Sequence, residues 1–223
     1  MSTFPLELDH IVIFTAVDAP EAEALEPYLQ GFGGVTKHGD LGTASTSFFF
    51  SNAYLELFWA HDDAAIERNI PALGHDSRKR MNWRTTGCSP FSLALRRRAD
   101  ADRPLPFPAT ALPASWMPGD IAIEFMTPSE AEPVCPVIPV PLQYPSWRQN
   151  IPEQNHPLGV RTLTDIHIAV VVSSLSPLAT ALEEAGLATI EPGPAPLITL
   201  TFDGGAQGKQ VDVRPILPLV LKG

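Results

Sequence analysis

Two histidines and two carboxylates recur in this chain of 223 residues at almost the same spacing. His10 and His167 are 157 residues apart, and Glu56 and Asp212 are 156 residues apart. In each copy the histidine lies near the start of the pattern and the carboxylate near its end. Imidazole and carboxylate groups transfer protons and ligate divalent metal ions. The spacing therefore indicates one unit used twice, and it nominates a chemical site.

The first copy contains the elements that would position such a site. Residues 8–15 form a short run rich in Ile and Val, which is typical of a buried strand. Asp18 is the expected N-cap of a helix with Pro20 in its first turn, and Pro27 should end or kink that helix. Three β-like runs follow, at residues 35–38, 44–51 and 53–60. The predicted order is strand, helix and three strands.

The second copy predicts the same order. Residues 163–172 predict a strand, and Ser176 with Pro177 predicts the start of a helix that Gly186 closes. Three further strands are expected at residues 189–191, 197–202 and 209–214, with a turn at 203–205.

Alternation along the strands predicts which side chains share a face. The two sets expected on one side are His10, Val12 and Phe14 in the first strand, and Asn52, Tyr54, Glu56 and Phe58 in the last. The intervening leucines and isoleucines would form the opposite, apolar face, which the helix would cover. The polar residues should therefore point into a hollow.

Composition restricts the class of protein. The chain is 44% hydrophobic and 18% charged, as in ordinary globular proteins, and it has no apolar run of about 18 residues that would span a membrane. The N-terminal residues lack the basic and apolar regions of a secretory signal, so we expect a cytoplasmic protein. The net charge of −10 argues against nucleic-acid and anionic-membrane partners. Cys88 and Cys135 have no CxxC spacing and are expected to be reduced thiols.

The middle of the chain differs from both copies. It contains 13 of the 24 prolines, between Pro104 and Pro157, and strand-like runs at residues 91–97, 121–126 and 137–144. The last run is expected to be an edge strand or an extended segment rather than a central strand, because proline has no amide donor. The region is either an ordered insertion or a degenerate third unit. The expected division of the chain is 1–75 for the first unit, 76–160 for the insert or middle unit, and 161–223 for the second unit.

Several short strings resemble the vicinal-oxygen-chelate superfamily, which includes glyoxalase I, extradiol dioxygenases and the bleomycin- and fosfomycin-resistance proteins. The strings are those of residues 8–13, 41–44, 54–57, 211–215 and 217–219. The chain is most similar to the branch known as glyoxalase-like domain proteins. The resemblance implies an α+β fold of paired βαβββ units that curl into an open cup, here with an irregular proline-rich insert.

The resemblance also implies a divalent metal ion at the floor of the cup, namely zinc, nickel, manganese or iron(II). The ligand positions fall on His10, Glu56, His167 and Asp212, and Glu56 would also be catalytic. The implied substrate pocket contains Phe14, Asn52, Tyr54, Phe58 and Arg214. The ligand would be a small molecule with neighbouring oxygens, and the reaction that of an isomerase, lyase or dioxygenase.

Other interpretations of these residues stay open. Asp212 is as well explained by an ion pair with Arg214 as by metal ligation. If the middle region pairs with the first unit, His167 would lie far from His10, and His156 and Glu124 become the substitute candidates. The remaining histidines, which lie in or beside turns, are expected to be solvated: His38, His61 and His75.

Two other functions also fit the sequence. The cup could bind or sequester an apolar molecule without a metal, as the resistance proteins of the superfamily are thought to do. Alternatively, the site is vestigial and the cup is filled by its own side chains, including Phe58 and those of residues 48–50. Two units in one chain permit a monomer, and a homodimer is the other expected state.

Overall fold

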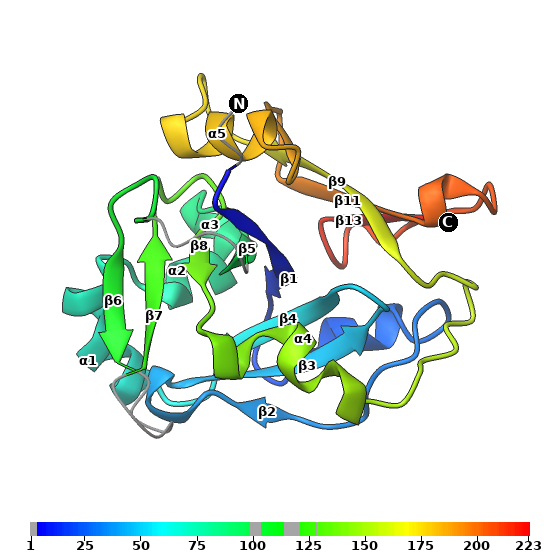
Figure 1. Ribbon diagram of the computed structural model, residues 1–223, viewed down its shortest axis with the longest axis horizontal. Helices are drawn as coiled ribbons and strands as arrows, with labels where there is room; N and C mark the ends of the chain where they lie inside the picture. Colours follow the sequence, from blue (N-terminus) through cyan, green and yellow to red (C-terminus); the bar gives the residue numbers. More distant parts are fainter. Residues whose placement is uncertain (1–3, 99–103, 114–120, 128) are drawn as a thin grey trace.

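Two β-sheets organise the computed structural model, which describes residues 4–98, 104–113, 121–127 and 129–223 (Figure 1). The larger sheet has the strand order β2-β3-β4-β1-β5-β8-β7-β6, and the smaller has the order β10-β9-β11-β13-β12. The fold is α+β, and the larger sheet is strongly curled and open.

The first half of the eight-stranded sheet comes from the first predicted unit. It contains β1 (Leu6–Phe14), β2 (Thr36–Lys37), β3 (Thr43–Phe49) and β4 (Tyr54–Ala60). Strand β1 pairs in parallel with β4, whereas β3 is antiparallel to both β4 and β2. The return of the chain from β4 therefore places the end of the unit directly beside its start.

The middle of the chain builds the second half of the same sheet. It contains β5 (Phe91–Arg97), β6 (Thr110–Pro113), β7 (Ala122–Met126) and β8 (Cys135–Val137). Strands β5 and β8 are parallel, and β7 is antiparallel to β8 and β6, so the pairing repeats that of the first half. Strands β1 and β5 join the halves in antiparallel fashion. The middle region is thus the partner of the first unit.

The helix predicted after β1 is only a single 3-10 turn, η1 (Pro20–Ala24). Asp18 and Ala19 have positive φ values of 63° and 44°, and the N-cap is Ala19, which offers no side-chain acceptor. The prediction of Asp18 as an N-cap was therefore wrong. A backbone in the left-handed region does not aim the side chain at the first helical amides.

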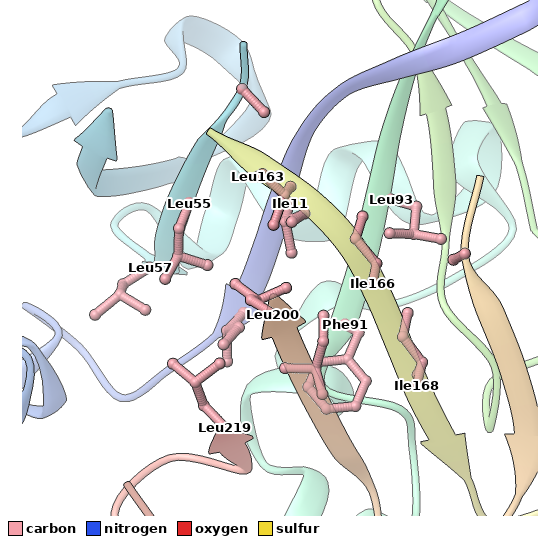
Figure 2. Close-up of a cluster of buried hydrophobic side chains, with 14 of the residues drawn as sticks. Ile11, Leu55, Leu57, Phe91, Leu93, Leu163, Ile166, Ile168, Leu200 and Leu219 are labelled. Atoms are coloured by element: carbon pink, nitrogen blue, oxygen red, sulfur yellow. The ribbon is translucent and has the colours of Figure 1, made fainter. Parts of the chain in front are cut away.

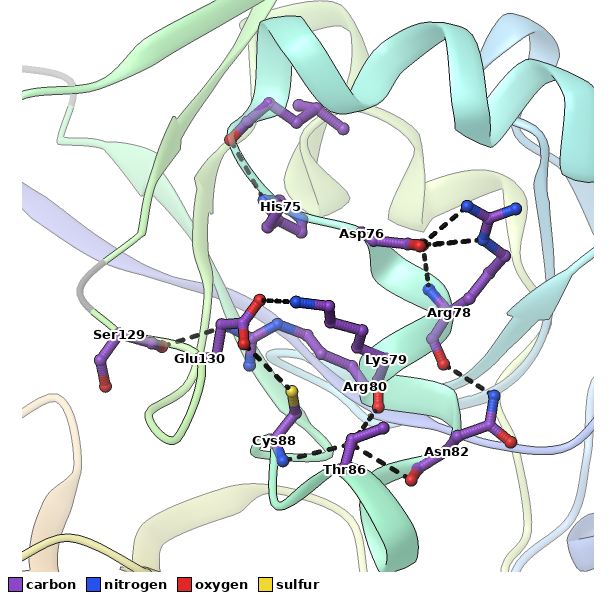
Figure 3. A network of polar contacts seen from close by, with 11 residues as sticks. His75, Asp76, Arg78, Lys79, Arg80, Asn82, Thr86, Cys88, Ser129 and Glu130 are labelled. Atoms are coloured by element: carbon purple, nitrogen blue, oxygen red, sulfur yellow. Dashed lines mark hydrogen bonds and ion pairs between the residues drawn. The ribbon is translucent and has the colours of Figure 1, made fainter.

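Short helices connect the two halves of the sheet. After β4 come α1 (Asp63–Leu73), α2 (Ser77–Met81) and α3 (Trp83–Thr86), while η2 (Gly39–Leu41) precedes β3. Figure 3 shows the polar contacts around α2, in which the Asp76 carboxylate accepts from the backbone and guanidinium of Arg78. The buried Arg80 donates to the carbonyl oxygens of Ser89 and Glu132 and so ties α2 to the second half.

The last unit forms the five-stranded sheet by itself. Its elements are β9 (Leu163–Val170), α5 (Pro177–Glu184), β10 (Thr189–Pro192), β11 (Leu197–Phe202), η5 (Asp203–Gly205), β12 (Gln210–Asp212) and β13 (Leu219–Lys222). Ser176 caps α5 as predicted, since its Oγ accepts from the amide of Ala179 at 3.2 Å. However, β9 pairs with β10 and β11, and both β11 and β13 lie between β9 and β12. The order of elements along the chain resembles that of the first unit, but the strand pairing differs.

A single apolar core joins the two sheets, and Figure 2 shows its centre. The eight-stranded sheet contributes Ile11, Leu55, Leu57, Phe91 and Leu93, and the smaller sheet contributes Leu163, Ile166, Ile168, Leu200 and Leu219. Each square ångström of apolar surface buried there stabilises the fold by about 25 cal/mol. The sequence predicted that a helix would cover this face. The five-stranded sheet packs against it instead.

One further segment crosses the opposite face of the larger sheet. It consists of η3 (Val140–Leu142), α4 (Tyr144–Trp147) and η4 (Arg148–Asn150), and we call residues 140–151 the covering segment. The prediction of an edge strand at residues 137–144 was wrong. Only Val137 belongs to a strand, and that strand, β8, lies between β5 and β7. Pro139 and Pro141 have no amide donors that could continue the ladder. In the part of the chain that the structure describes, no helix has the length and apolarity to cross a membrane.

Candidate functional site

A cavity of about 460 Å³ lies on the face of the eight-stranded sheet that is turned away from the shared core. Side chains alternate along β1 as predicted: His10, Val12 and Phe14 line the cavity, whereas Ile11 and Ile13 lie in the core. The same alternation along β4 places its polar residues in the cavity. The wall opposite comes from the second half of the sheet.

Aromatic rings make up much of the cavity wall. The rings are those of Phe14, Phe32, Phe49, Tyr54, Phe58, Phe125 and Trp147. Phe14 and Phe58 meet edge to face at 5.4 Å. The cup is not filled by its own side chains, because Phe48 and Phe50 belong to the shared core and a cavity remains.

His10 is held by a carboxylate from its own strand. The register of β1 against β5 shifts between Leu8 and His10, so Asp9 lies at an irregularity of the ladder. Asp9 is fully buried, and its Oδ1 accepts from His10 Nδ1 at 2.8 Å. The imidazole stacks on Tyr54 with the ring centroids 4.3 Å apart. These contacts use Nδ1 and leave His10 Nε2 for Glu56 and the cavity, and bulges of this kind often re-aim a side chain at a functional site.

Glu56 lies between two imidazoles. Its Oε2 is 3.6 Å from His10 Nε2, and its Oε1 is 3.5 Å from His38 Nε2. The Ser45 hydroxyl donates to Glu56 Oε1 at 2.7 Å. Because that hydroxyl proton is used, the 3.3 Å contact between Ser45 Oγ and His38 Nε2 requires the histidine to be the donor. His38, Ser45 and Glu56 therefore form one hydrogen-bonded group, and His10 Nε2 lies close to its carboxylate without a hydrogen bond.

The charge state of Glu56 follows from these neighbours. Burial alone would raise its pKa, but the hydrogen bond and charge of His38, the charge of His10 and the Ser45 hydroxyl outweigh burial and lower the pKa to about 2. Glu56 is therefore ionised at neutral pH. A buried carboxylate is stable only when partners of this kind replace its water.

Tyr54 adds a protonated hydroxyl to the cavity. Burial first, and then the negative charges of Glu56 and Asp9, raise the pKa of its phenol well above the usual value. The phenol therefore stays protonated at neutral pH and can donate a hydrogen bond.

His38 and His75 line the cavity, although the sequence predicted solvated histidines. His38 stacks on Phe58 at 4.8 Å, and His75 is buried with Nδ1 3.2 Å from the carbonyl oxygen of Leu73. Burial, and then the charge of Arg80, lower the pKa of His75, so its imidazole is neutral at neutral pH. The glycines that follow His38 and precede His75 suggested turns. The only sequence signal for His38 was its place at the end of a β-like run.

The structure does not bring the four predicted ligands together. His10 and Glu56 share the cavity, but His167 is on β9 and Asp212 on β12, both in the five-stranded sheet. The side chain of His167 is 36% exposed and pairs with Glu191 at 3.3 Å. Asp212 is exposed and forms the ion pair with Arg214 that the sequence also suggested.

The other predicted pocket residues divide in the same way. Phe14, Tyr54 and Phe58 line the cavity, whereas Asn52 and Arg214 do not. Asn52 instead exchanges two hydrogen bonds with the backbone of Leu163, which starts β9. Asn52 lies before β4, which begins at Tyr54, so the alternation of side chains along that strand does not extend to it.

The two substitute candidates have partners within the fold. His156 is buried, its Nδ1 accepts from the amide of Gln30 at 3.0 Å, and its Nε2 lies 3.0 Å from the carbonyl oxygen of Phe49. Glu124 forms an ion pair with Arg97 at 2.8 Å. Both residues therefore tie segments together.

The donor set does not fit the divalent metal that the resemblance implied. Among the described residues, no group of three or more His, Cys, Asp or Glu side chains is placed to hold a metal ion. The Oε1 of Glu56 already accepts from Ser45, and the opposite wall offers Ser92 and Pro136 from β5 and β8. Because that wall has no imidazole or carboxylate on these strands, we derive no chemical step through a metal.

Solved structures resemble this fold. A hypothetical protein from Staphylococcus aureus matches over 97% of this chain and 99% of the other, with a TM-score of 0.50 and 10% sequence identity. At this identity the likeness concerns the fold alone. A mutant of 4-hydroxymandelate synthase from Streptomyces coelicolor matches over 97% of this chain and 62% of that chain, with a TM-score of 0.42 and 14% identity, a likeness too weak to support more.

The sequence matches no family model and no curated protein. The curled, open α+β sheet is compatible with the glyoxalase type of fold that the sequence resembles.

Proposed function

We propose that this protein is a glyoxalase-like small-molecule enzyme, and that His10, Glu56 and His38 act on a ligand bound in the cup. The observation that carries the proposal is the close approach of two histidines to an ionised glutamate on the wall of an aromatic cavity. Active sites are where buried titratable groups are held in such arrangements.

The cavity suggests the kind of ligand. Its volume of about 460 Å³ suits a small molecule, and its many aromatic and aliphatic walls favour a ligand with an apolar body. His10, Glu56 and Tyr54 form one polar part of the lining, and a polar end of the ligand would face them. A carbonyl or hydroxyl oxygen at that end could accept a hydrogen bond from Tyr54.

The geometry favours proton transfer. His10 donates from Nδ1 to Asp9, so the lone pair of Nε2 faces the cavity and can take a proton from a carbon next to a carbonyl group. Glu56, whose pKa of about 2 makes it a poor base, would stabilise the imidazolium that forms. In this scheme Glu56 is a charge partner, and His10 is the base. An enolisation of this kind serves isomerases and lyases.

The test uses phenylacetone as a probe in D2O, with proton exchange beside its carbonyl followed by NMR. We expect the protein to accelerate exchange and the His10→Asn variant to lose this acceleration by about 100-fold or more. His167→Asn, which changes the corresponding residue of the last unit, is the matched control and should exchange at the wild-type rate. Equal acceleration by wild type and His10→Asn would reject His10 as the base.

A second candidate is a binding protein that holds an apolar molecule without changing it. The extent of the aromatic wall favours this version. It predicts that phenylacetone raises the Tm of wild type and of His10→Asn by the same amount, with no exchange above the uncatalysed rate.

A further inference from the structure

The covering segment forms part of the cavity wall. Leu142, Trp147 and Ile151 from this segment line the cavity beside the sheet residues. The Trp147 ring lies edge-on to Tyr54 at 5.5 Å and to Phe49 at 5.6 Å. A ligand in the cup would therefore touch both the covering segment and the ring on which His10 stacks.

Asp9 joins this segment to His10 directly. The carboxylate divides its two oxygens: Oδ1 accepts from His10 Nδ1 at 2.8 Å, while Oδ2 accepts from the backbone amide of Tyr144 at 2.9 Å. Arg96 also donates to Oδ2, at 3.3 Å. The Tyr144 hydroxyl provides a second anchor by donating to the carbonyl oxygen of Phe50 at 2.5 Å. A single buried side chain thus bonds the covering segment and the proposed base.

Burial makes these bonds depend on one another. Asp9 is fully buried, and a buried carboxylate that loses one donor must find another or bear a large desolvation cost. When the amide of Tyr144 moves away, Arg96 is the remaining donor on Oδ2, and the carboxylate shifts relative to His10. Interactions that stabilise the covering segment in this position therefore also stabilise the position of the imidazole. The reverse also holds, because such coupling is reciprocal.

We propose that Asp9 is a positioning residue that couples the covering segment to His10, so that packing of a ligand against Trp147 fixes the tautomer and orientation of the imidazole. The catalytic consequence rests on the proposed function. The structural coupling between the covering segment and His10 does not rest on the proposed function, because it concerns hydrogen bonds that the protein forms without a substrate.

The test is the Asp9→Asn variant, studied without a ligand by NMR. An asparagine amide has one oxygen, so it can accept from His10 Nδ1 or from the Tyr144 amide but not from both in the wild-type manner. We expect either a change of the His10 tautomer, measured by the ring 15N shifts, or at least tenfold faster hydrogen exchange of the Tyr144 amide. If both readouts keep their wild-type values, the inference is overturned.

Three variants separate coupling from general damage. Tyr144→Phe removes the hydroxyl bond to Phe50 but keeps the amide bond to Asp9, and should leave the His10 tautomer unchanged. Trp147→Ala weakens the segment without touching Asp9 and should change the His10 tautomer, measured by the ring 15N shifts, whereas Trp83→Ala, which removes a ring stacked under Arg84 outside the cavity lining, should not. An unchanged His10 tautomer in Trp147→Ala would contradict the coupling.

Activity provides a separate readout. If phenylacetone exchange is catalysed, Asp9→Asn should lower kcat at least tenfold with little change in KM, because tautomer and orientation matter more for proton transfer than for binding. If no exchange is found but the NMR effects appear, the proposed function fails and the coupling stands.

Discussion

Strands β1 and β9 carry similar residues but have different surroundings. Each contains an aspartate and a histidine within an apolar run, yet the His10 side chain is 8% exposed beside a cavity, and the His167 side chain is 36% exposed beside Glu191. In the first unit β4 returns next to β1, so Val12 and Glu56 are register partners on adjacent strands. In the last unit two strands separate β9 from β12. The comparison teaches that strand pairing, more than residue order, decides whether a histidine and a carboxylate meet.

The largest expected effect concerns the core that the two regions share. Phe91 is fully buried between the sheets, and Phe91→Ala should cost about 3 to 5 kcal/mol of unfolding free energy. Urea unfolding followed by circular dichroism and by tryptophan fluorescence should give one coincident transition, because both sheets contribute to one core. Phe32→Ala, at a ring that is 46% exposed, is the control and should cost about 1 kcal/mol or less. Two separate transitions would show that the sheets are independent.

The next largest effect is expected for Glu56, the carboxylate of the first unit. The folded-state pKa of Glu56 is about 2 against an ordinary value of 4.5, so its contribution to stability is present above pH 4.5 and is lost as the pH falls toward 2. This contribution is on the order of 3 kcal/mol. Glu56→Gln should therefore be less stable than wild type at pH 6, and the gap in urea unfolding free energy should narrow at pH 3. A gap that is the same at both values would mean that Glu56 titrates normally.

A smaller effect is expected from the two histidines. His10→Gln removes a donor from the buried Asp9 and should cost about 1 to 3 kcal/mol, whereas His167→Gln should change the unfolding free energy by about 0.5 kcal/mol or less. Thermal or urea unfolding of the two variants measures the difference. Equal losses would remove the contrast between β1 and β9.

The smallest effect is expected at Asp212. Its hydrogen bonds and charge interaction with Arg214 lower its pKa to about 2, as for Glu56, but both side chains are exposed to water that screens the pair. Asp212→Asn should leave the unfolding curve at pH 6 unchanged within error. A loss as large as that of Glu56→Gln would give Asp212 a role that its exposure does not suggest.

Much of the fold could be predicted from local patterns. The strands at residues 8–15, 44–51, 53–60 and 163–172 and the Ser176 cap follow from alternation, proline and cap chemistry, and the structure contains them with small shifts of their ends. The inward face of His10 and Glu56 follows from the period of two along a strand. These features depend on residues close together in the sequence.

Strand pairing could not be predicted in the same way, because it depends on contacts between distant segments. The runs at 53–60 and 209–214 end as a neighbour of β1 and as an edge strand. The second run is more polar, as edge strands often are, but neither run specifies which strand lies beside it. The many prolines of the middle region left open whether it was an insertion or a third unit. Its strands β5 to β8 complete the eight-stranded sheet. Asp9 also has a role that its sequence does not reveal, since the irregular register beside His10 and the distant amide of Tyr144 produce it.

The order of synthesis gives the shared core a further consequence. Ile11, Leu55 and Leu93 emerge from the ribosome early, while the side chains that bury them begin at Leu163. The apolar face of the larger sheet therefore stays exposed to solvent until β9, β11 and β13 are translated. Chaperones that bind exposed apolar surfaces should bind the nascent chain in this interval. They should dissociate once the five-stranded sheet has packed against the larger one.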